Sequence, residues 1–198
     1  MSFMAMYSLE ASRRTVYGVS VCDLDWNSTL SFVNELTFVS HAQTVIAFLS
    51  SEKAKRLSRD PGYRAALSHQ LVFPEGKGMD DASQAAHGVK FPMTTNSEDF
   101  VPALLTYMDV PKRVGLIGAD ALMVENAAEA LSRHAPWHSF IALPTANAAD
   151  ETTYSKHNQL QNLKLDVVLI AMETPEQEKW ALTHLRMEDA RLVIAVGS

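Results

Sequence analysis

Asp166-Val-Val-Leu-Ile-Ala171 is the stretch that decides the fold class. It is apolar, β-branched and without alternation, which is typical of a strand in a parallel sheet that helices cover on both faces. Working outward from it, short apolar runs predict three further buried strands, at Arg113–Gly118, Ser139–Leu143 and Arg191–Val196. The second half of the chain is therefore built around a sheet.

Helices are predicted between these strands. Residues at helical spacing fill Ala121–His134, and a second helix is predicted over Glu176–Leu185, with Pro175 near its first turn. Strand and helix alternating at this spacing predict βαβ units, whose right-handed crossovers place helices on both faces. We therefore expect an α/β fold with a Rossmann-like, mainly parallel sheet, forming a single domain over residues 1–198. Residues 1–14 are expected to be flexible.

The first half of the chain is less regular. Its pattern predicts strands and helices in the order Thr15–Val21 (strand), Ser28–Val39 (helix), Thr44–Leu49 (strand), Glu52–Leu57 (helix), Tyr63–Ser68 (helix), Leu71–Phe73 (strand), Ala82–Ala86 (helix) and Asp99–Tyr107 (helix). Ser97 is the expected N-cap of the last helix. A turn is predicted over Phe73–Gly78.

Composition excludes several classes of protein. With 17 Lys and Arg against 23 Asp and Glu, the net charge of −6 argues against a nucleic-acid partner. No apolar run is long enough to span a membrane, and the N-terminus does not resemble a signal peptide. The single cysteine, Cys22, is expected to be a small apolar residue in or beside a strand. No zinc-ligand spacing is visible, and we expect neither a metal site nor a cofactor.

The densest basic stretch is Lys53–Arg59, which contains Lys53, Lys55, Arg56 and Arg59. Such a run is consistent with a solvated helix face or with a local patch that binds phosphate or a lipid surface. The residues alone leave both alternatives open.

Three predicted loops follow strands and are the candidate sites of chemistry, because ligands of open parallel sheets bind at the carboxyl ends of strands. They are Pro74–Gly78, Gly118–Asp120 and Glu173–Gln177, and we expect them to converge on one cleft. The second loop could offer backbone N–H groups to a phosphate or be a tight turn only. In the third, Gln177 and Glu178 could hydrogen-bond a sugar or uracil, or cap the helix.

Four segments carry a resemblance to a known family. They are Asp60–Gly76 with its Asp-Pro-Gly-Tyr-Arg and Pro-Glu-Gly motifs, Ser97–Leu105, Arg113–Gly118, and Asp166–Trp180 followed by Val196-Gly197. Their order and spacing resemble the bacterial N-acetylmannosaminyltransferases of the WecG/TagA/CpsF group, glycosyltransferase family 26. The resemblance covers about residues 16 to 197.

This resemblance implies the transfer, with inversion, of an N-acetylmannosamine-type sugar from a UDP donor to a polyprenyl-diphosphate-linked acceptor. The carboxylate base of the family falls on Glu75, one methylene longer than the family's aspartate. Gly76, Asp99, Gly118, Gln177 and Glu178 fall on positions that the family uses for substrate binding. The resemblance implies no cofactor and no metal.

Other positions depart from the family pattern. Its Thr-x-Asn motif falls on Phe48 and Ser50, an arginine falls on Thr94, a glycine on Glu173 and a lysine on Glu176. Two added carboxylates beside a UDP site have the wrong sign of charge. The sequence ends at Ser198, whereas the family pattern continues into an arginine-rich appendage.

These observations leave three hypotheses. The chain is a weak or catalytically eroded relative of the family, a pseudoenzyme in the extreme case; or an active inverting hexosaminyltransferase with Glu75 as base; or an unrelated α/β ligand-binding protein. The expected partners are a UDP-sugar and a lipid-linked acceptor in cell-envelope polysaccharide synthesis, with peripheral membrane contact, a partner protein or self-association as further expectations. We expect a cytoplasmic chain, peripheral to the inner face of the membrane.

Overall fold

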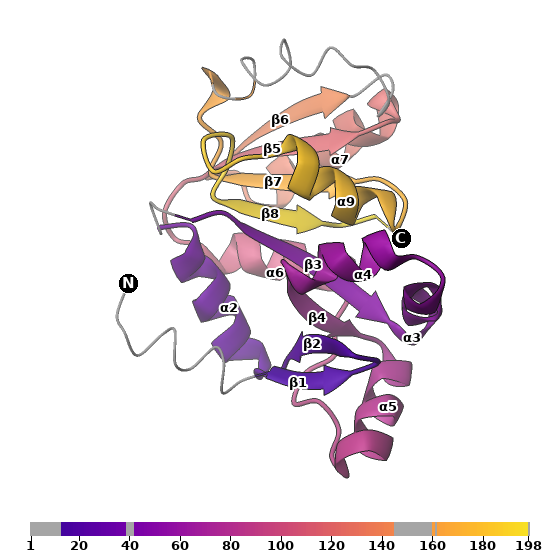
Figure 1. Cartoon of the computed structure of the whole chain (residues 1–198). Coiled ribbons are helices and arrows are strands. Elements are labelled where there is room, and N and C mark those ends of the chain that lie inside the picture. The colour runs from indigo at the N-terminus through magenta and orange to yellow at the C-terminus, as the bar shows by residue number, and fades with distance from the viewer. Residues whose placement is uncertain (1–12, 39–41, 145–159, 161, 198) are drawn as a thin grey trace.

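An eight-stranded sheet runs through the molecule in the order β1-β2-β4-β3-β8-β7-β5-β6 (Figure 1). The computed structural model describes residues 13–38, 42–144, 160 and 162–197. The strands are β1 (Arg13–Val16), β2 (Val19–Cys22), β3 (Thr44–Ser50), β4 (Leu71–Glu75), β5 (Arg113–Gly118), β6 (Ser139–Pro144), β7 (Val167–Ala171) and β8 (Leu192–Ala195). All neighbours pair in parallel except β1 and β2. The predicted Rossmann-like α/β fold is confirmed.

Helices cover both faces of the sheet (Figure 1). They are α2 (Trp26–Leu36), α3 (Ser51–Ala54), the 3-10 helix η1 (Lys55–Ser58), α4 (Pro61–Ser68), α5 (Lys77–His87), α6 (Ser97–Tyr107), α7 (Ala121–His134) and α9 (Glu176–His184). Helices α2, α6 and α7 pack in one apolar cluster on the first face. Helices α4 and α9 pack on the other face and contact each other. Among the described residues, no helix combines the length and apolar character needed to cross a membrane.

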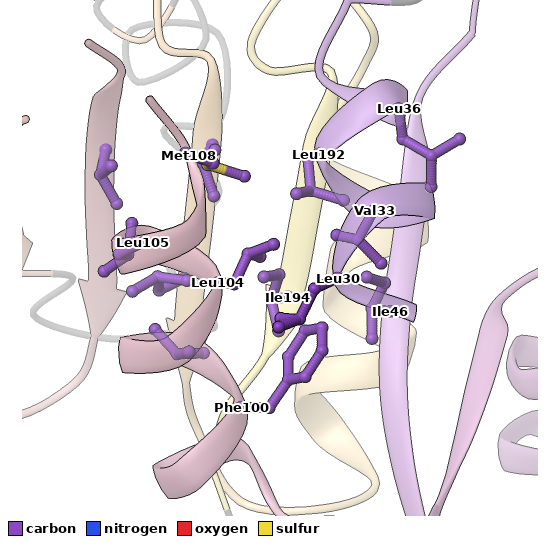
Figure 2. Packing of buried hydrophobic residues seen from close by; sticks show 14 of the residues in the cluster. Leu30, Val33, Leu36, Ile46, Phe100, Leu104, Leu105, Met108, Leu192 and Ile194 are labelled. Atoms are coloured by element: carbon purple, nitrogen blue, oxygen red, sulfur yellow. The ribbon is translucent and has the colours of Figure 1, made fainter. Parts of the chain in front are cut away.

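The core of the first face lies between α2 and α6, above β3 and β8. Figure 2 shows Phe100 and Leu104 of α6 meeting Leu30 of α2 over Ile194 of β8. Phe100 also contacts the aromatic rings of β3 and β4, with ring centroids 5.9 Å from Phe48 and 5.2 Å from Phe73. This aromatic cluster fixes the position of the two strands that end beside Glu75.

The prediction of one continuous strand over Thr15–Val21 is wrong. The chain turns back at Tyr17 and Gly18, both with positive φ, so that β1 and β2 form a hairpin with Val16 opposite Val19. Two-residue hairpin turns require this backbone conformation, which a tyrosine does not signal in the sequence. Residues 1–12 of the segment expected to be flexible lie outside the described residues, and β1 begins at Arg13.

Several other boundaries in the first half differ from prediction. Asn96, not Ser97, caps α6, because its Oδ1 accepts a hydrogen bond from the Asp99 amide at 2.7 Å. The predicted turn after Phe73 is shorter, since β4 continues to Glu75 and α5 begins at Lys77. Helix α2 ends at Leu36, and Val39 lies outside the described residues.

Cys22 is buried at the end of β2, as expected for a small apolar residue. Burial raises the pKa of its thiol to about 11. The thiol is therefore protonated at neutral pH, and a thiolate nucleophile is not available at this position.

Candidate functional site

The carboxyl ends of the parallel strands β4, β3, β8, β7 and β5 lie along one edge of the sheet, which we call the carboxyl edge. Strand β5 continues into α7 on one face, whereas β7 continues into α9 on the other. In open α/β sheets, ligands bind between neighbouring strands whose following helices lie on opposite faces of the sheet. All three predicted site loops start from this edge.

Glu75 is the last residue of β4, and its carboxylate is held by a lysine. Lys53 Nζ lies 3.0 Å from Glu75 Oε2, and it also donates to the Phe48 carbonyl oxygen at 3.3 Å. Both partners of the ion pair are largely shielded, with side-chain exposures of 14% for Lys53 and 23% for Glu75. In this arrangement the candidate base is neutralised by a neighbouring cation.

The local backbone places the lysine there. Ser50 lies opposite Glu75 in the register of β3 and β4, and its Oγ accepts a hydrogen bond from the Lys53 amide at 3.2 Å, which begins α3. Helix α5 starts against the same turn, since a Cβ on Gly78 would lie 2.2 Å from Ser51 Oγ. The close approach of α3 and α5 brings Lys53 to the end of β4.

The two positions on which the resemblance places the family's Thr-x-Asn motif have structural roles in this chain. Phe48 is buried in the aromatic cluster with Phe73 and Phe100 and lies in the core of the first face. Ser50 is engaged as the N-cap of α3. We see no equivalent of the family's polar pair in either side chain.

Gln177 lies in the first turn of α9, but its side chain is buried and satisfied by the protein. Its Oε1 accepts from the Gly197 amide and its Nε2 donates to the Gly197 carbonyl, both at 2.8 Å. A Cβ on Gly197 would lie 1.7 Å from the Met172 carbonyl oxygen, so this approach requires glycine. Gln177 therefore joins the end of β8 to the turn before α9.

Glu178 is fully buried beside it. Its Oε1 accepts from Thr174 Oγ1 at 3.2 Å and from Gln177 Nε2 at 3.3 Å. Its Oε2 and the hydroxyl of buried Tyr63 have no hydrogen-bond partner among the described residues. Burial raises the pKa of the Glu178 carboxyl, and burial together with the nearby Glu178 charge raises the pKa of Tyr63.

This buried carboxyl gives a prediction about stability. The folded protein holds the Glu178 proton more tightly than the unfolded chain, because burial raises the pKa of Glu178 above its ordinary value of 4.5. Glu178 therefore lowers the free energy of unfolding as pH rises above this value. We expect Glu178→Gln to lack this contribution and to gain stability relative to wild type between pH 4 and pH 7. Urea denaturation at several pH values measures the difference. Exposed Glu176 on the same helix is the control, and equal pH dependence in Glu176→Gln and Glu178→Gln would contradict the prediction.

The remaining candidate residues lie at the same edge. Gly76 is exposed, has φ 75, and has no atom within 4 Å of an added Cβ. Asp99 is exposed in the first turn of α6. Gly118 is buried at the end of β5, where a Cβ would lie 2.7 Å from Val124 Cγ2 and 3.0 Å from the Ala171 carbonyl oxygen. Gly118 thus allows α7 and β7 to approach β5.

Two cavities open along this edge. One, of about 320 Å³, is mainly apolar and lies between α6 and α7, with Ala171 and Val196 in its wall. The other, of about 400 Å³, lies between η1 and Pro175. Glu75 lines neither of them, so neither cavity unites the three predicted loops.

The sequence did not predict the residues that contact the candidate site residues. Lys53 and Arg56 were visible only as part of a basic run, and Gln70, whose Nε2 donates to the Glu178 carbonyl at 2.8 Å, gave no signal. Within the described part of the chain, no three His, Cys, Asp or Glu residues are placed to hold a metal ion. His134 and His138 have helical spacing, but their rings bond different carbonyls, those of Pro102 and Leu105.

Comparison with known proteins shows which family this chain belongs to. None of the curated proteins compared with this sequence matches it. Residues 14–198 match the family described as "Glycosyl transferase WecG/TagA/CpsF family". This match spans nearly the whole chain and includes every strand of the sheet except the first residue of β1. The chain therefore belongs to the WecG/TagA/CpsF family of glycosyl transferases.

Proposed function

We propose that this chain is an attenuated member of its family, which binds a nucleotide-sugar donor at the carboxyl edge and transfers the sugar weakly. Family membership implies a sugar donor and an acceptor, and it removes the hypothesis of an unrelated α/β protein. The donor we propose is UDP-N-acetylmannosamine or its uronate, and the acceptor is a sugar linked to a lipid diphosphate. The observation that carries the proposal is the ion pair between Glu75 and Lys53.

Inverting transfer needs a carboxylate that takes the proton of the acceptor hydroxyl while its oxygen attacks the anomeric carbon. The bond from that carbon to the diphosphate breaks, and UDP leaves with the electron pair. Glu75 is the carboxylate proposed for this step. With Lys53 at 3.0 Å, its oxygen is engaged by an ammonium group that must separate before the carboxylate can accept a proton.

Charge at the edge also opposes donor binding. Glu173 and Glu176 are exposed in the turn and first residue of α9, where the family pattern has a glycine and a lysine. Half-buried Thr94 replaces an arginine that would pair with the diphosphate. Hydrogen bonds from a charged group are typically worth about 1.5–3 kcal/mol, so these replacements support weak binding of UDP.

Restoring one charge tests whether the carboxyl edge binds the donor. We expect Glu176→Lys to bind UDP about three- to tenfold more tightly than wild type, because it replaces a repulsion with an attraction at an exposed position worth roughly 1 kcal/mol. Isothermal titration calorimetry at low ionic strength measures the change. Glu188→Lys alters the net charge equally at an exposed position beyond the other end of α9 and is the control.

If Glu188→Lys strengthens UDP binding as much as Glu176→Lys does, the effect comes from net charge and the proposed donor site is wrong. No effect of either substitution also contradicts the site. The second candidate function is efficient transfer by the same site. It is favoured by Glu75, whose partly exposed carboxylate stands at the position of the family base, and rapid turnover by the wild-type chain would establish it.

A further inference from the structure

A basic surface on α3 and η1 surrounds a cavity to which the proposed function has so far assigned no role. The cavity has a volume of about 400 Å³, and its wall consists of Glu52, Lys55, Arg56, Arg59, Asp60 and Pro175. We call it the basic pocket. Ligand sites in proteins usually fall between about 300 and 1,000 Å³, so the pocket is large enough for a small ligand.

The charges of this pocket do not cancel. Both of its carboxylates are already paired, Glu52 with Lys55 at 2.9 Å and Asp60 with Lys179 at 2.6 Å. The side chain of Arg59 has no hydrogen-bond or ion-pair partner among the described residues. A local excess of positive charge in a chain of net charge −6 concentrates anions at this point of the surface.

Arg56 places the pocket at the carboxyl edge. Its Nη1 donates to the carbonyl oxygen of Thr174, in the turn before α9, while its other N–H groups have no hydrogen-bond partner among the described residues. Lys53, in the preceding turn of the same segment, contacts Glu75. The segment that carries the pocket therefore also contacts the candidate site, through Lys53 at Glu75 and through Arg56 at the turn before α9.

We propose that the basic pocket is a phosphate-binding site, in which Arg56 and Arg59 bind phosphate oxygens and Lys55 neutralises Glu52. Guanidinium groups present planar pairs of N–H donors that match the geometry of phosphate oxygens. The same chemistry is offered by the diphosphate of a nucleotide sugar and by the headgroup of an anionic lipid. The proposal rests on the proposed function only for the identity of the nucleotide.

Inorganic pyrophosphate is the direct probe, because its binding requires no turnover and no sugar. We expect calorimetry to show that Arg59→Gln weakens pyrophosphate binding about tenfold and that Lys55→Gln/Arg59→Gln weakens it further, as for the loss of charged hydrogen bonds. Arg59 is the first choice for substitution because its side chain makes no hydrogen bond or ion pair among the described residues. Arg133→Gln on α7, where the arginine pairs with Glu129, removes the same charge elsewhere and is the control.

A second measurement identifies the source of the phosphate. Sedimentation with vesicles of phosphatidylglycerol and phosphatidylcholine is compared for wild type and Lys55→Gln/Arg59→Gln, with UDP as competitor. Loss of vesicle binding in the variant, without competition by UDP, assigns the pocket to a lipid headgroup. Competition between pyrophosphate and UDP in calorimetry assigns it to the nucleotide. If the double variant retains wild-type affinity in both measurements, or wild type binds neither probe, the proposal is overturned.

The experiments distinguish failure of the proposed donor site from failure of the proposed phosphate site. If Glu176→Lys leaves UDP binding unchanged while Arg59→Gln weakens pyrophosphate binding about tenfold, the phosphate site stands and the proposed donor site falls. The opposite pair of results leaves the donor site and removes the basic pocket.

Discussion

Phe100→Ala is expected to lower the free energy of unfolding by about 3–5 kcal/mol, the range measured for truncation of a buried phenylalanine. Phe100 is fully buried, and its ring contacts those of Trp26, Phe48 and Phe73 at centroid distances of 5.2 to 6.1 Å. Because these partners belong to α2, β3 and β4, collapse around the missing ring would require several elements to move together. Chemical denaturation followed by circular dichroism measures the loss.

Tyr107 provides the matched control for this substitution. It is an aromatic residue of the same helix, α6, but its side chain is 44% exposed. We expect Tyr107→Ala to change the free energy of unfolding by less than about 1 kcal/mol, as for most surface substitutions. A loss below about 1 kcal/mol in Phe100→Ala, or equal losses in both variants, would show that the aromatic cluster is not packed as described.

Most of the sheet could be predicted because its strands are buried on both faces. Val167–Ala171 and Leu192–Ala195 are apolar without alternation, and in a chain with intervening helices this pattern strongly favours strands of a covered parallel sheet. The hairpin at Tyr17 and Gly18 could not be predicted in the same way. Its turn depends on two positive φ angles, one of them in a residue that rarely adopts them.

The direction of individual side chains at the site was harder to predict than their place on the sheet. Gln177 and Glu178 lie at the start of a helix beside a strand end, as predicted, yet both side chains are buried. Gln177 bonds the Gly197 backbone twice, and Glu178 accepts hydrogen bonds from Thr174 and Gln177. That approach depends on contacts between segments distant in sequence. Whether the two residues also touch a substrate stays a prediction.

The ion pair at Glu75 has the same origin. It requires β3 and β4 to pair in a register that sets Ser50 opposite Glu75, and α3 to begin at once after β3. Neither condition is visible in the local pattern around Lys53. The direction of the Phe48 side chain, by contrast, could be predicted. Phe48 lies two residues after Ile46 on β3, so both side chains point to the same face, and both belong to the cluster on the first face.

Lys53→Met is expected to increase sugar transfer, and the increase should depend on Glu75. Removing the ammonium group 3.0 Å from the carboxylate frees an oxygen that can then accept the proton of the acceptor hydroxyl. A positioned general base typically contributes about 10²–10⁴-fold to rate, so Glu75→Gln in the Lys53→Met background should lower turnover by about 100-fold or more. Turnover of UDP-N-acetylmannosamine with a lipid-diphosphate-linked acceptor measures all four members of the cycle.

The signs of the effects in this cycle distinguish an attenuated enzyme from an efficient transferase. Asp81→Asn, at an exposed position of α5 outside the candidate site residues, removes a carboxylate of equal charge and is the control for the Glu75 effect. A gain in Lys53→Met that persists when Glu75 is replaced would mean that the lysine acts on donor binding and that Glu75 is not the base. If instead wild type turns over rapidly and Lys53→Met slows it, the ion pair positions Glu75 for catalysis. The chain would then be an efficient transferase. The coupling between Lys53 and Glu75 would favour turnover, whereas in an attenuated enzyme it would oppose turnover.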